Sequence, residues 1–364
     1  MKTRRRNYNE DEIKDRLSDL PDCVLLHILS FLSAKESVQT CVLSTRWKNL
    51  WKYLPTLTLT SYPQFKTLKG FTNFVSRILS LRDHSTALHT LHFHRHGIVQ
   101  PHLLQRIIKY AVSQNVQQMC IHVYCDIEHF PPCFFSCQTL TSLTLYVEQP
   151  GIFPQRTLFS YSLNMPALTS LTLSFFNFRG GAEPFLACPK LKRLFISDCD
   201  VLDKQNLYIS STTLVDLTIH CYPWNEIKFS LCTPSLCSFT FRGNPVQKLC
   251  ESNNNLSSIK YLNIHVRMGS NFAETSLVLL NWLQEVATIK SLTISSTTLH
   301  ILSLARDILK VEFPFFCNLK SLKVNKKWSR NSFIPDGIVK YLLRKSPLAE
   351  FEFIDHSREG LLGW

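Results

Sequence analysis

The residues whose spacing most resembles a chemical site are three alternating histidines, His92, His94 and His96, in the segment LHFHRHG. On a β-strand, side chains two positions apart point to the same face, so this spacing would bring the three imidazoles together. A metal site needs further ligands, and no Cys, Asp or Glu lies beside them in the sequence. We therefore interpret them as exposed side chains of a strand and expect no metal or cofactor.

Cysteine chemistry and hydrolytic chemistry are also poorly supported. The 13 cysteines form no CxxC pair, and the shortest spacings, such as Cys133 to Cys137, have no matching histidine set. We interpret them as free thiols that behave as small apolar side chains. The motifs of serine hydrolases, phosphate-binding loops and zinc proteases are absent from the sequence. We expect no enzyme activity.

Charge and hydropathy narrow the class of protein further. The chain has 364 residues and 40 Lys and Arg against 27 Asp and Glu, a net charge of +13, but its one dense basic cluster is Lys2 with Arg4 to Arg6. A nucleic-acid surface would need a basic stripe interleaved with aromatics, which is missing. No apolar run reaches the 18 residues of a membrane span, and the charged N-terminus has no secretory signal. We expect the nucleus or the cytoplasm, with no membrane partner.

Residues 16–54 hold the densest helix signals of the chain. Pro21 suits a first helical turn, and the apolar residues after it recur at helical spacing up to Leu32. Ser33 and Glu36 fit a capping box that would start a second helix. Ser44 could cap a third helix, in which Trp47 and its apolar neighbours face one side. So short a unit cannot bury all its apolar side chains within itself, so part of that surface must contact something else.

This stretch, LSDLPDCVLLHILSFLSAKESVQTCVLSTRWKNLW, resembles an F-box of the plant type. The resemblance implies binding to the Skp-type adaptor of an SCF ubiquitin ligase and, through the adaptor, to a cullin. It further implies an adaptor interface or F-box core made of Leu20, Pro21, Leu25, Ile28, Leu29, Val38, Val42, Leu43 and Trp47. We expect the edge formed by Leu20, Pro21 and Leu25 to face outward.

The rest of the chain follows a repeat. The template L-x-x-L-x-L, with any large apolar residue at the L positions, recurs at spacings of 22 to 30 residues. These spacings are typical of leucine-rich repeats, in which each unit adds one short parallel strand. The units begin at Leu88, Val116, Leu140, Leu168, Leu191, Leu214, Leu236, Ile259, Ile289, Leu319 and Leu348. The longer units have room for a helix after the strand. In the shorter units we expect an extended or 3₁₀ segment in that place.

The predicted fold class is α/β, a three-helix F-box followed by a leucine-rich-repeat solenoid. We divide the chain into a disordered tail (1–15), the F-box (16–56), a helical linker and N-terminal cap with the first repeat (57–115), and the solenoid (116–364). Within the cap, helices are expected at 70–81 and 100–113. The segment at about 315–364 is similar to part of the FBD motif found with F-boxes in the same plant family.

Residues that alternate with the leucines should lie on the concave face of the solenoid. Because the face combines Arg, His and aromatic residues, it suits protein recognition. The candidates for substrate binding are His122, Tyr146, Arg193, Phe195, His220, Arg242, Tyr261, His265 and Lys323.

Three functions remain open. The first is the substrate-recognition subunit of an SCF-type E3 ubiquitin ligase, which would carry a protein substrate on its repeats. The second is an interaction scaffold that works without a ligase and whose first helices only cap the solenoid. The third is a basic binder of anions or nucleic acid.

Overall fold

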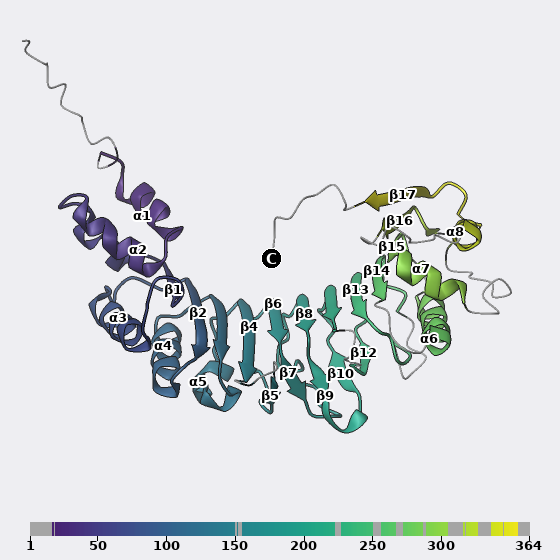
Figure 1. Cartoon of the computed structure of the whole chain (residues 1–364), viewed down its shortest axis with the longest axis horizontal. Helices are drawn as coiled ribbons and strands as arrows, with labels where there is room; N and C mark the ends of the chain where they lie inside the picture. The colour runs from purple at the N-terminus through teal and green to yellow at the C-terminus, as the bar shows by residue number, and fades with distance from the viewer. Residues whose placement is uncertain are drawn as a thin grey trace, which may run out of the picture.

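The protein is an elongated arc of stacked repeats with a helical unit at its N-terminal end (Figure 1). This computed structural model describes residues 17, 19–149, 151, 155–222, 227–249, 256–266, 272–286, 289–304, 316, 318–326, 336–344 and 346–355. The predicted tail at 1–15 and parts of the FBD-like segment (327–335 and 356–364) lie outside these residues. None of the helices described is long and apolar enough to cross a membrane.

One sheet organises the described part of the chain. It has fifteen strands, and its main path runs through neighbouring parallel strands from one end of the arc to the other. Three further strands, β5, β7 and β9, lie off this path. The strands of the main path are β1 (Thr56–Thr60), β2 (Thr90–Ile98), β3 (Gln118–Tyr124), β4 (Ser142–Gln149), β6 (Ser170–Ser174), β8 (Arg193–Ser197), β11 (Asp216–His220), β13 (Ser238–Gly243), β14 (Tyr261–Val266), β15 (Ser291–Ser295), β16 (Ser321–Lys326) and β17 (Glu350–Asp355).

All eleven predicted units form strands of this path, so the leucine-rich-repeat solenoid is confirmed. One strand of the main path, β1, was not predicted, although Leu54, Leu57 and Leu59 fit the template. β1 pairs with β2 in parallel, and all three leucines are buried. The sheet therefore begins within the last residues of the stretch that resembles an F-box.

The second layer changes with repeat length, as expected. Units of 28 to 30 residues carry helices, with one exception: the unit from Leu140 forms the extended strand β5 instead. The helices of this layer are α3 (Leu68–Leu81), α4 (Pro101–Ser113), α5 (Pro132–Phe135), α6 (Phe272–Glu285), α7 (Ser296–Ser303) and α8 (Asp336–Leu343). The extended elements are β5 (Gln155–Phe159), β7 (Phe176–Phe178), β9 (Asp200–Val201), β10 (Leu207–Ser210) and β12 (Phe229–Cys232). In Figure 1 this layer lies on the outer side of the arc and the main sheet on the inner side.

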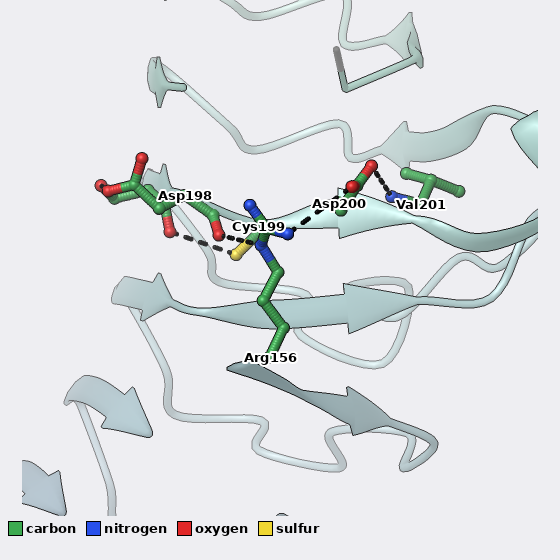
Figure 2. Close-up of polar contacts among 6 residues, drawn as sticks. Arg156, Asp198, Cys199, Asp200 and Val201 are labelled. Atoms are coloured by element: carbon green, nitrogen blue, oxygen red, sulfur yellow. Dashed lines mark hydrogen bonds and ion pairs between the residues drawn. The ribbon is translucent and has the colours of Figure 1, made fainter. Parts of the chain in front are cut away.

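In the middle of the outer layer, the side chain of one arginine, Arg156, contacts the turn between β8 and β9 (Figure 2). Arg156 of β5 donates through Nε to the carbonyl oxygen of Asp198 at 2.6 Å, and its Nη1 lies 3.7 Å from the Asp200 carboxylate. Asp198 has a φ of 54°, a left-handed conformation that non-glycine residues seldom adopt. Because a charged donor satisfies the carbonyl of this turn, Arg156 helps to hold the chain where it leaves β8 for β9.

Two α-helices and two 3₁₀ helices make up the N-terminal helical unit, residues 17–54: α1 (Asp22–Ser30), α2 (Ala34–Gln39), η1 (Thr40–Val42) and η2 (Trp47–Tyr53). The capping box at Ser33 and Glu36 is present, as predicted. The predicted third α-helix is instead the 3₁₀ helix η2, although Trp47, Leu50 and Trp51 are buried as its spacing indicated. The predicted burial was correct and the helix type was wrong.

Polar contacts join the helical unit to the solenoid. Gln64, which follows β1, donates to the Ser33 hydroxyl at 2.5 Å, and its carbonyl accepts from Lys35. Arg82, 2% exposed at the end of α3, donates to the backbone carbonyl of Leu54. Because the unit also shares β1 with the sheet, its orientation on the arc is held at several points.

The burial pattern makes a direct prediction about stability. Leu173 of β6 is 0% exposed between the sheet and the outer layer, whereas its neighbour Thr172 lies on the inner face. Leu173→Ala should lower the free energy of unfolding by about 2–5 kcal/mol, because it removes buried methyl groups and leaves a cavity. Urea denaturation of Leu173→Ala and of the control Thr172→Ala measures this, and equal losses in the two variants would contradict the assigned faces.

Candidate functional site

The helical unit has an apolar face that the rest of the described chain does not cover. On α1, Leu25 and Leu29 are fully buried, whereas Val24 and Ile28 on the other side remain exposed. The most exposed members lie at or just after helix ends, with Phe31 at 76%, Val42 at 82% and Leu43 at 60%. We define the apolar face by its exposed members, Leu17, Val24, Ile28, Phe31, Val42 and Leu43.

The residues that the resemblance assigned to the adaptor interface or the core now separate by burial. Leu25, Leu29 and Trp47 are buried, Leu20 and Val38 are half-buried, and Pro21, Ile28, Val42 and Leu43 are exposed. The expectation that Leu25 faces outward is therefore wrong, because its side chain packs into the hydrophobic core. Leu17, Val24 and Phe31 were missed. The available signal was a second i, i+4, i+7 series, Val24, Ile28 and Phe31, beside the series that contains Leu25.

Local contacts hold this face in shape. The Arg46 guanidinium lies 2.7 Å from the Asp22 carboxylate, which connects the start of α1 to the segment before η2. The Ser33 hydroxyl donates to the Glu36 carboxylate at 2.7 Å and the Ser33 backbone N–H donates to it at 2.9 Å, and these two bonds lower the pKa of Glu36. Ser37 donates to the Leu29 carbonyl and joins α2 to α1. The exposed apolar side chains therefore stand on an ordered scaffold.

The second candidate surface is the inner face of the sheet. Parallel pairing in constant register aligns its residues in three rows that run along the arc. The first row contains Arg193, Asp216, Ser238 and Tyr261, and the second contains Thr172, Phe195, Thr218, Thr240 and Asn263. The third row contains Thr60, His94, His122, Tyr146, Ser174, Ser197, His220, Arg242 and His265.

The nine predicted substrate-binding residues are spread unequally over these rows. The third row takes five of them, in two groups that Ser174 and Ser197 separate: His122 with Tyr146, and His220 with Arg242 and His265. Phe195 of the second row joins the second group, with its ring 4.9 Å from His220. Arg193 and Tyr261 lie in the first row, apart from both groups. Lys323 lies near the C-terminal end, where it pairs with Glu352 at 2.8 Å.

The first group is part of an aromatic and imidazole cluster, which we define as His94, His96, His122, Tyr146 and Glu148. The rings of His94 and His122 stack with centroids 4.4 Å apart, and Tyr146 lies 3.9 Å from His122. The Tyr146 hydroxyl donates to the Glu148 carboxylate at 2.6 Å. Glu148 was not predicted, although Tyr146 and Glu148 alternate on one strand and so point the same way.

Burial and like charge control protonation in the cluster. Desolvation, followed by repulsion from His94 and His96, lowers the pKa of His122 to about 4. Desolvation and His96 lower the pKa of His94 too. Desolvation and the nearby Glu148 raise the pKa of Tyr146. At neutral pH the rings of His94 and His122 are therefore neutral and can stack and form hydrogen bonds.

The described residues offer little for catalysis. They contain no group of three or more His, Cys, Asp or Glu side chains able to hold a metal ion, the alternating histidines included. Burial raises the pKa of Cys125, Cys199 and Cys221 to about 12. Such thiols stay protonated at neutral pH and are poor nucleophiles.

Comparison with known proteins identifies the first surface. A family model described as the F-box domain matches residues 17–58. Residues 17–58 are an F-box domain. The match includes the helical unit and the first residues of β1, so the F-box contributes a strand to the solenoid as well as the exposed apolar face.

Relatives resemble the chain over most of its length. An F-box/LRR-repeat protein of Arabidopsis thaliana is 27% identical over 327 residues, which cover 85% of this chain and 67% of that protein. Another Arabidopsis protein of that name is 27% identical over 93% of this chain and 90% of its own length. A putative F-box/FBD/LRR-repeat protein of the same plant is 28% identical over 70% of this chain and 54% of its own. The F-box and the repeats thus occur together in these relatives, as they do in this chain.

The lowered pKa of His122 predicts a pH dependence of stability. The unfolded chain binds a proton at His122 below about pH 6.5, whereas the folded chain binds it only near pH 4. Protonation therefore favours the unfolded chain between these two values. The contribution of neutral His122 to the stability of the fold is complete above pH 6.5 and is lost as the pH falls toward 4. His122→Gln should reduce the drop in melting temperature between pH 7 and pH 5. His102→Gln, in the exposed part of α4, is the control. An unchanged drop in His122→Gln would contradict the prediction.

Proposed function

We propose that this protein is the substrate-recognition subunit of an SCF-type E3 ubiquitin ligase. Its F-box binds a Skp-type adaptor, which links it to a cullin, and its repeats hold a protein substrate. The observation that carries the proposal is the exposed apolar face of the F-box, because a small unit that leaves six large apolar side chains exposed is expected to cover them with a partner protein.

The arrangement of the F-box supports an adaptor contact. The unit rests on the solenoid through β1, Gln64 and Arg82, and these contacts leave Phe31, Val42 and Leu43 exposed. A unit that served only as a cap for the repeats would direct its apolar side chains into them. This distinction favours the ligase subunit over a scaffold whose first helices only close the solenoid.

The inner face supports the contact with a protein substrate. Its rows combine threonine and serine hydroxyls with a few aromatic and basic side chains, and it runs the length of the sheet. Aromatic residues and arginine are enriched where proteins bind one another. The aromatic and imidazole cluster and the group formed by Phe195, His220 and Arg242 are two places where a substrate would gain most contact.

The adaptor contact can be tested with a double variant. Phe31→Glu with Val42→Glu should reduce co-purification with a Skp-type adaptor at least tenfold, because two charges would be buried in an apolar interface. The melting temperature should stay within about 2 °C of the wild-type value, since both side chains are exposed and exposed substitutions change stability little.

Leu186→Glu provides the matched control, because Leu186 is 66% exposed but lies in the repeats, outside the F-box. This variant should co-purify like the wild type. Undiminished adaptor binding by the double variant, or no binding by the wild-type protein, would contradict the proposal.

A further inference from the structure

Three consecutive repeats near the C-terminal end share a short motif. A lysine stands between the first leucine position and the strand in Ile259-Lys260-Tyr261-Leu262, Ile289-Lys290-Ser291-Leu292 and Leu319-Lys320-Ser321-Leu322. The leucine positions of the motif are buried, and the three lysines are exposed. The lysines therefore lie at the rim of the sheet, immediately before β14, β15 and β16.

Backbone hydrogen bonds place the three lysines directly beside one another. The Lys290 N–H donates to the Lys260 carbonyl at 2.8 Å, and the Lys320 N–H donates to the Lys290 carbonyl at 2.8 Å. Neighbouring strands lie about 4.8 Å apart, so the three side chains leave the rim at that spacing. We call Lys260, Lys290 and Lys320 the lysine rim.

The described part of the chain forms no ion pair with this rim, although the exposed Glu350 lies beside Lys320 through a backbone hydrogen bond. No described carboxylate lies within ion-pair distance of any of the three ammonium groups. Lys323, on the inner face, does have a partner in Glu352. Like charges directly opposite each other on neighbouring strands are destabilising. The three lysines precede the strands but are neighbours through their backbone hydrogen bonds, so their charges repel one another and an anionic partner would relieve that repulsion.

We propose that the lysine rim binds an acidic segment, a short run of Asp or Glu residues, of the protein carried on the repeats. This inference rests on the proposed function, because it takes the repeats to hold a protein substrate. Tyr261, 53% exposed beside Lys260, and the hydroxyls of Ser291 and Ser321 extend the rim onto the inner face. A bound chain could thus place carboxylates at the rim and its other side chains on the inner face.

Two observations favour an acidic protein segment over nucleic acid or the adaptor. The rim offers three adjacent charges, and Val215 and Cys237 separate it from Lys192, which occupies the same position three repeats before Lys260. A nucleic-acid interface with about six to ten phosphate contacts needs more basic groups than the three lysines of the rim supply. An adaptor bound to the F-box would lie far from the rim, because the F-box lies at one end of the arc and β14 to β16 lie near the other (Figure 1).

The test uses the full chain with its adaptor and two fluorescent peptides, one of alternating Glu and Ala and one of alternating Gln and Ala. Fluorescence anisotropy at about 20 mM salt measures the affinity of each peptide for the wild type and for the rim variant. The rim variant combines Lys260→Gln, Lys290→Gln and Lys320→Gln. The control variant, Lys66→Gln, Lys69→Gln, Lys109→Gln combined, removes the same charge from exposed lysines near the F-box end. A short DNA duplex of equal charge is measured in parallel.

The Glu peptide should bind the wild type, lose at least tenfold in affinity in the rim variant and less than threefold in the control variant. The rim variant should keep its adaptor and its melting temperature, which separates this result from failure of the proposed function and from misfolding. Equal losses in the two variants would show a net-charge effect and overturn the inference. Tighter, rim-dependent binding of the DNA, or no binding of the Glu peptide to the wild type, would overturn it as well.

Discussion

The structure depends on one constraint: a single repeat cannot bury its own leucines. Each unit contributes one strand to the sheet and one short element to the outer layer. Its apolar side chains lose contact with water only when the next unit stacks on it. The leucine positions of the stack, such as Leu143, Leu217 and Leu292, are at most 1% exposed. Stacking in constant register then aligns the residues between the leucines, so the rows of the inner face follow from the packing of the core.

The same stacking connects the F-box to the repeats. Leu54, Leu57 and Leu59 bury the end of the F-box in the solenoid core, and β1 extends the sheet by one strand. The F-box is therefore held on the arc by shared core and shared backbone hydrogen bonds, which are stiffer than a linker. A partner on the F-box and a partner on the inner face would be kept at a defined separation, as a subunit that presents one protein to another requires.

The net charge of +13 is not spread evenly over the surfaces of the repeats. The middle of the inner face is largely uncharged, with Thr172, Thr218 and Thr240 along its second row. In its aromatic and imidazole cluster, burial lowers the pKa of His94 and His122, so these two rings are neutral at physiological pH. The lysine rim stands instead at the edge of the sheet, where the ammonium groups remain in water. Shape and hydrogen bonding thus dominate the face, and electrostatic attraction belongs to its border.

The sequence alone determined the F-box, the repeats and the strand face of each candidate, because periodic burial leaves a periodic pattern of leucines. It was enough to place all nine substrate candidates on strands and to predict the capping box at Ser33. Tertiary structure decided the rest: Leu25 is core while Phe31 is surface, η2 is a 3₁₀ helix, and His122 meets His94 and Tyr146. Neighbours in a solenoid are one repeat apart in the chain, so only the register of the folded sheet determines which side chains touch.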